Sequence, residues 1–156
     1  MILEKNFIKK LNKARVLNAV KSYYPSPSYE ELSSIYDSML NLLLKSTYPL
    51  GVYKIEKKPK TINYNLLKDY DYLVYCLVTI GDETEYIIDN FFDENQFTHA
   101  ILLDAMASSL LFEISSQLSS GYLSTVCHFS INGILFGFIS FNCSHKLHSL
   151  CTFLDH

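Results

Sequence analysis

The stretch that decides the fold is YLVYCLVTIGDETEYIIDNFFDENQFTHAILLDAMASSLLFEISSQLS, residues 72–119. It opens with an almost unbroken apolar run at residues 72–80, which predicts a strand that is buried on both faces. Gly81 and Asp82 then predict a tight turn, because glycine adopts backbone conformations that other residues avoid. Residues 83–92 predict a short amphipathic helix, whose first-turn acids suit the helix dipole.

A second and longer helix is predicted at residues 98–120, with Gly121 as its terminator. Its apolar side chains recur at helical spacing and define a face that points into the core. Asp104 is expected just inside the start of this helix, one turn before Ser108. Glu113 is expected on the polar side of the helix, away from the apolar line.

The residues before this stretch predict two helices and a strand. Residues 4–22 carry apolar side chains at near-helical spacing, and prolines end the pattern. Ser28 and Glu31 form a capping-box motif, which opens a helix that runs to about Leu44. Residues 52–57 alternate apolar and charged side chains, as a half-exposed strand does.

The residues after the long helix predict two strands, at 123–129 and 133–141, around a hairpin turn at Asn132-Gly133. Residues 143–156 show no clear period and are expected to form a divergent or disordered tail. The sequence shows no internal repeat, so residues 1–156 are expected to form a single domain.

Composition narrows the class of protein. The 156 residues are 49% hydrophobic and 19% charged, which is typical of a soluble globular domain. A net charge of -3 gives no electrostatic reason to expect nucleic-acid binding. We expect no membrane span and no secretory signal, and therefore a cytoplasmic protein. The four cysteines are then expected to be thiols, with Cys76 buried in its strand.

Residues 72–119 resemble the activation domain of cobalamin-dependent methionine synthase and the small stand-alone proteins built on that domain. The matching features are an apolar strand ending in Thr79-Ile80-Gly81, an acidic helix, and a helix that carries Leu103-Asp104-Ala105 and then Glu113. The order of the preceding elements also fits. The resemblance implies an α+β fold, in which helices flank a twisted, mostly antiparallel sheet.

The resemblance also implies a function: a module that binds S-adenosylmethionine and assists the reductive remethylation of methionine synthase. The cobalamin would be held by a separate module of the synthase or by another corrinoid protein, and a flavodoxin-type partner would supply an electron. The residues implied to bind the methyl donor are Thr79, Gly81, Asp104, Glu113, His128 and Ser130. No catalytic side chain and no metal site are implied. The alternative is a degenerate binding or scaffolding module, which docks on a corrinoid protein or methyltransferase and has no ligand of its own.

The sequence departs from the family just after the long helix. Family members usually have Arg-x-Ser-Pro-Gly-Tyr there, whereas this chain has His128 at the arginine position and no Gly-Tyr. An arginine offers five donors that grip a carboxylate in two places, and a histidine offers at most two. Losing that grip weakens binding by about 2–3 kcal/mol, or roughly two orders of magnitude. The departure also suggests a frameshifted or truncated end, which sequencing the gene around codons 121–130 would test.

Each of these residues also has a purely structural explanation. An acid near a helix N-terminus, as Asp104 is expected to be, is favoured by the dipole alone. Glu113 would then pair with Gln117 in solvent, and Thr79 and Gly81 would form a tight strand-to-helix turn. The C-terminal tail contains four possible zinc ligands: Cys143, His145, His148 and Cys151. Their spacing matches no standard zinc finger, so no metal site is predicted.

Overall fold

The computed structural model describes residues 1–61, 72–126 and 134–140, with side chains described up to residue 119. Helices and a sheet both contribute, so the predicted α+β class is confirmed. The elements are β1 (Ile2–Glu4), α1 (Lys13–Tyr23), α2 (Tyr29–Ser46), β2 (Leu50–Lys57), β3 (Tyr72–Thr79), α3 (Glu83–Asp93), α4 (Phe97–Val126) and β4 (Ile134–Ser140).

The strands form an open sheet in the order β1-β2-β3-β4. The β1–β2 and β2–β3 pairs are antiparallel, whereas β4 runs parallel to β3. The parallel pair is possible because α3 and α4 carry the chain back between the two strands, as a crossover connection must. The sheet is therefore mostly antiparallel within the described residues, as predicted.

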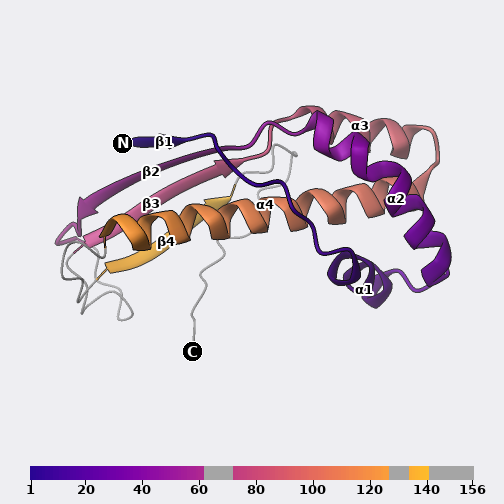
Figure 1. Ribbon diagram of the computed structural model, residues 1–156, viewed down its shortest axis with the longest axis horizontal. Coiled ribbons are helices and arrows are strands. Elements are labelled where there is room, and N and C mark those ends of the chain that lie inside the picture. Colours follow the sequence, from indigo (N-terminus) through magenta and orange to yellow (C-terminus); the bar gives the residue numbers. More distant parts are fainter. Residues whose placement is uncertain (62–71, 127–133, 141–156) are drawn as a thin grey trace.

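Helix α4 runs the length of the molecule and organises the core (Figure 1). Its N-terminal half lies among α1, α2 and α3, and its C-terminal half lies along one face of the sheet. The sheet approaches this half closely at Gly51, where an added Cβ would lie 2.9 Å from Leu118 Cδ2. The core side chains of α4 are fully or almost fully buried; they are Leu102, Leu103, Met106, Ala107, Leu110, Leu111, Ile114 and Leu118.

Four of the predicted elements are confirmed, and their ends differ from the prediction by no more than two residues. The helix after the capping box is α2, and the Ser28 hydroxyl accepts a hydrogen bond from Glu31 N at 3.0 Å, as an N-cap does. The strands β2 and β3 and the helix α3 also lie where the patterns placed them. Cys76 is buried in β3, as predicted.

The prediction of a helix over residues 4–22 is wrong in its first half. Ile2–Glu4 pairs instead with β2 as an edge strand, and the helix begins only at Lys13. Asn12 sets that start, because its side chain accepts a hydrogen bond from Arg15 N at 3.1 Å. Phe7, which fitted the helical spacing, packs toward Gly51 of the sheet instead.

The prediction for the region after the long helix is also wrong in part. Gly121 does not end the helix, which continues to Val126, so residues 123–126 are helical and not a strand. A glycine inside a helix costs only about 1 kcal/mol relative to alanine and does not by itself end the helix. The second predicted strand exists as β4, but it pairs in parallel with β3. The hairpin turn at Asn132-Gly133 and the tail at 143–156 lie outside the described residues.

Strand β3 is buried mainly on one face, which corrects the predicted burial on both; on the other face Leu73 is buried, but its neighbours Tyr75 and Leu77 are exposed. Val74, Cys76 and Val78 point into the core, whereas Tyr75 and Leu77 alternate with them and are 39% and 42% exposed. The apolar run at residues 72–80 therefore supplies a core face and an exposed apolar face.

Helix α4 also bears on the expectation that no segment spans a membrane. Its Phe97–Ser119 part is long and apolar enough to cross a membrane by length and composition alone. The core helix of a soluble protein has the same properties, and one side of α4 packs throughout this part against the other elements.

Candidate functional site

Thr79 and Gly81 form the turn that joins β3 to α3. The Thr79 hydroxyl accepts a hydrogen bond from Gly81 N at 3.1 Å, and Gly81 has a φ of 91°, which favours glycine. Tyr48 N donates to the Ile80 carbonyl oxygen at 2.7 Å and ties the turn to the segment before β2. These two bonds and the φ of Gly81 hold the turn in its shape, as the structural explanation for the two residues requires.

Asp104 lies on the surface of α4, but not near its start. The helix begins at Phe97, so Asp104 is almost two turns into it, and the dipole of the N-terminus does not explain its presence. The residue keeps contact with solvent, yet enough protein surrounds its carboxyl group to raise the pKa above the ordinary 3.8 through desolvation. Among the described residues Asp104 has no hydrogen-bond partner. It therefore remains able to accept hydrogen bonds from a ligand.

Helix α1 contributes two side chains to the surface around Asp104. Tyr23, at the end of α1, lies close enough for the charge of Asp104 to help burial raise the pKa of the Tyr23 hydroxyl. Arg15, near the start of α1, places its guanidinium 4.7 Å from the centre of the Phe112 ring of α4. Asp104, Ser108 and Phe112 are spaced one turn apart and are all exposed.

Sequence reasoning missed Tyr23 as a neighbour of Asp104 and missed the contact between Arg15 and Phe112 on the same side of α4. One signal was available, because Arg15 is the only arginine in the 156 residues. The contact itself depends on how α1 packs across α4, which no local pattern encodes. We call Arg15, Tyr23, Asp104, Ser108 and Phe112 the α1–α4 surface.

Glu113 does not belong to this surface. It lies nine residues after Asp104, which at 3.6 residues per turn places it about 180° around α4. The suggested pairing with Gln117 is wrong, because the Gln117 side chain bonds the backbone of Ile8 instead. Its Oε1 accepts from Ile8 N at 2.9 Å, and its Nε2 donates to the Ile8 carbonyl oxygen at 2.8 Å.

The described site residues thus occupy three separate places: the turn after β3, the α1–α4 surface and the opposite side of α4. His128 and Ser130 lie outside the described residues, as do Cys143, His145, His148 and Cys151. Across residues 1–61 and 72–119, no group of three His, Cys, Asp or Glu side chains could hold a metal ion.

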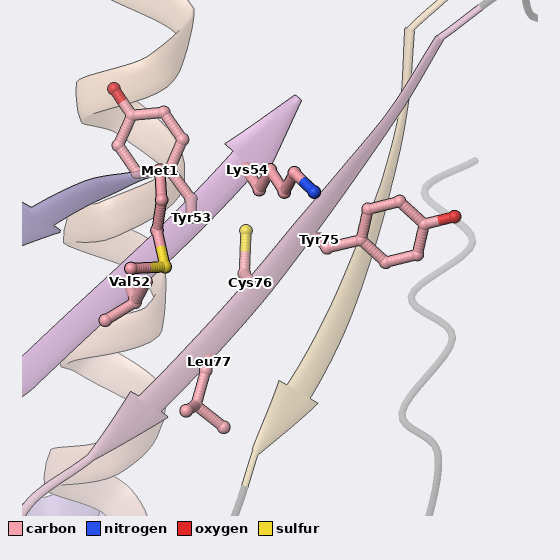
Figure 2. Close-up of a pocket in the computed structure, with 7 residues that line it drawn as sticks. All are labelled: Met1, Val52, Tyr53, Lys54, Tyr75, Cys76 and Leu77. Atoms are coloured by element: carbon pink, nitrogen blue, oxygen red, sulfur yellow. The ribbon is translucent and has the colours of Figure 1, made fainter. Parts of the chain in front are cut away.

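A shallow hollow of about 200 Å³ lies over β2 and β3 (Figure 2). Its walls are mainly apolar, with the Lys54 ammonium group at one side. None of the predicted site residues lines it; the lining residues are Met1, Val52, Tyr53, Lys54, Tyr75, Cys76 and Leu77. A small polar ligand would find few partners there, so the hollow does not replace the α1–α4 surface as a candidate site.

Comparison of the chain with protein-family models and with curated proteins finds no match.

Proposed function

We propose that this protein is a module that binds S-adenosylmethionine and assists the reductive remethylation of cobalamin-dependent methionine synthase. The observation that carries the proposal is the position of Asp104. The motif residue lies on the surface of α4, without a hydrogen-bond partner among the described residues and without a helix N-terminus to explain it. The order of β3, α3 and α4 agrees with the element order that the resemblance implies.

The chemistry of Asp104 suits this ligand. S-adenosylmethionine carries an ammonium group and two ribose hydroxyls, all of which donate hydrogen bonds, and a positively charged sulfonium. A carboxylate accepts such hydrogen bonds, and each bond to a charged acceptor contributes about 1.5–3 kcal/mol. Because part of the surroundings of Asp104 is already desolvated, a bound ligand would interact with it more strongly than in bulk water.

The contribution of this chain would be to position the methyl donor. The cobalamin would be held by a partner, the cobalamin-binding module of methionine synthase or another corrinoid protein, and a flavodoxin-type protein would supply the electron. Holding the methyl group in reach of the reacting centre removes much of the entropic cost of a bimolecular step. The corrinoid itself carries the difficult chemistry.

Isothermal titration calorimetry tests the proposal. S-Adenosylmethionine should bind the wild-type protein, and adenosine should bind less well because it lacks the methionine moiety. Asp104→Asn should weaken binding roughly 10- to 100-fold, since it removes an ionised acceptor. Asp89→Asn, which neutralises an exposed acid on α3, is the matched control and should bind as the wild type does. Absence of heat with the wild-type protein would refute the proposal.

A second candidate function is a binding module without a ligand, which docks on a corrinoid protein or methyltransferase. The exposed apolar face of the sheet favours it. Leu3, Val52 and Leu77 are paired across β1, β2 and β3, and Leu3 and Leu77 are 54% and 42% exposed. Exposed apolar patches often mark protein-binding sites. Binding to a cobalamin-binding module without affinity for S-adenosylmethionine would support this candidate over the first.

A further inference from the structure

The α1–α4 surface has a basic end and an acidic end. Arg15 and Phe112 form the basic end, and Asp104 with Tyr23 forms the acidic end. Ser108 lies between Asp104 and Phe112 on α4, so a small side chain separates the two ends. Such a surface suits a ligand that carries an anionic group at one end and hydrogen-bond donors at the other.

The packing of α1 and a contact with Phe112 hold the guanidinium of Arg15 in place. Val16, Leu17 and Val20 bury the other side of α1 in the core and so fix the helix on α4. The stacking of the guanidinium on Phe112 leaves its N–H groups, which point outward in its own plane, able to donate. No carboxylate pairs with Arg15 within residues 1–61 and 72–119. A ligand would therefore gain a charged contact without breaking an existing one.

The spacing of the two ends lies within the reach of the methyl donor. Asp104 and Phe112 are eight residues apart on α4, which corresponds to about 12 Å along the helix axis. In an extended S-adenosylmethionine, roughly eight single bonds of about 1.5 Å separate the carboxylate from the ribose hydroxyls, a zigzag span of roughly 10 Å. With a hydrogen bond of about 2.8 Å at each end, the fully extended ligand reaches across roughly 16 Å, so a partly bent ligand bridges two ends that lie about 12 Å apart along α4.

We propose that Arg15 is the carboxylate anchor of this protein: it grips the carboxylate of the methionine moiety on the α1–α4 surface, while Asp104 accepts hydrogen bonds from the ribose hydroxyls. The inference rests on the proposed function. It also explains how binding survives the loss of the usual arginine after the long helix, since Arg15 is the only residue of the chain with a guanidinium group. No other side chain can form a bidentate contact with a carboxylate in this way.

Calorimetry with two ligands tests the anchor. Decarboxylated S-adenosylmethionine lacks the carboxylate and should bind the wild-type protein roughly 10- to 100-fold more weakly than S-adenosylmethionine does. Arg15→Gln should weaken binding of S-adenosylmethionine by a similar factor and bind the two ligands almost equally. Arg15→Lys keeps the charge but loses the bidentate geometry, so its affinity should fall between the two. Lys45→Gln, which removes an exposed positive charge from α2, should behave as the wild type.

The outcomes separate this inference from the proposed function. If S-adenosylmethionine does not bind the wild-type protein, the proposed function fails and the anchor with it. If it binds and Arg15→Gln still prefers it to the decarboxylated ligand as strongly as the wild type does, the anchor is wrong and the proposed function stands. Thermal melts of both Arg15 variants show whether each variant is folded. The preference between the two ligands is measured within one variant, so this preference does not depend on the amount of folded protein.

Discussion

The close approach of α4 to β2 at Gly51 makes a prediction about paired substitutions. An added Cβ at Gly51 would lie 2.9 Å from both Leu118 Cδ2 and Phe7 Cζ. Gly51→Val places two further methyl groups in this space, and overpacking of this kind costs about 2–3 kcal/mol. Leu118→Ala empties part of the same space and costs about 2–4 kcal/mol, because Leu118 is only 3% exposed.

The double variant should be far more stable than the sum of the single costs suggests. Valine adds as many carbon atoms at position 51 as alanine removes at position 118, and volume-conserving changes cost less than about 1.5 kcal/mol. We therefore expect a coupling free energy of at least about 2 kcal/mol in the free energy of unfolding, measured by urea denaturation. Gly51→Val combined with Leu110→Ala, two turns away, should be additive within about 0.5 kcal/mol. Additive costs for Gly51→Val with Leu118→Ala would show that α4 does not pack on β2 as described.

Three further predictions concern single side chains. Thr84→Val should cost about 1–3 kcal/mol in urea denaturation, because the buried Thr84 and Ser46 hydroxyls bond each other at 2.9 Å, and Thr84→Ser should retain most of that stability. Gly81→Ala should lower the free energy of unfolding by more than about 1 kcal/mol because residue 81 has a φ of 91°, although the added Cβ would meet nothing closer than 3.7 Å. A melting temperature equal to that of the wild type would contradict this. Asp104→Asn should stabilise the protein modestly at pH 7, since burial raises the pKa of the folded carboxyl above 3.8 and so disfavours its charged form. That gain should shrink as the pH falls through the folded pKa and vanish below 3.8, where the carboxyl is protonated in both states; a gain that grows on acidification would refute the assignment.

Local patterns were sufficient for the elements whose signals lie within a few residues. The capping box at Ser28 gave the start of α2, and the alternation in residues 52–57 gave most of β2. The apolar run at residues 72–80 predicts β3 correctly but not how far its two faces are buried. The same run of apolar residues is compatible with a strand that is covered on one face or on both. Whether a helix covers the second face is decided by the topology.

The errors in the N-terminal and C-terminal regions have different origins. Ile2–Glu4 pairs with β2, a partner about fifty residues away in the chain, and this pairing overrides the weak helical spacing of the first residues. The prediction that Gly121 ends the helix rests on the residue type alone, and a helix tolerates one glycine.

The candidate site could be predicted only in part. The sequence identified Asp104, but it placed the residue at the helix start and grouped it with Glu113 and Thr79, which the fold keeps apart. The residue that lies near Asp104 is Tyr23 of α1, about eighty residues earlier in the chain. Contacts of that kind follow from the packing of helices and not from any motif.

Nuclear magnetic resonance of the ¹⁵N-labelled protein during titration with S-adenosylmethionine tests the central claim most directly, because it reports both binding and its place. We predict shifts of amide signals that are largest in α1 (Lys13–Tyr23) and around Asp104, Ser108 and Phe112 of α4. Signals of the outer sheet face, such as those of Val52 and Leu77, should move little. An unchanged spectrum at millimolar ligand, or shifts centred on the sheet and not on α1 and α4, would contradict the account.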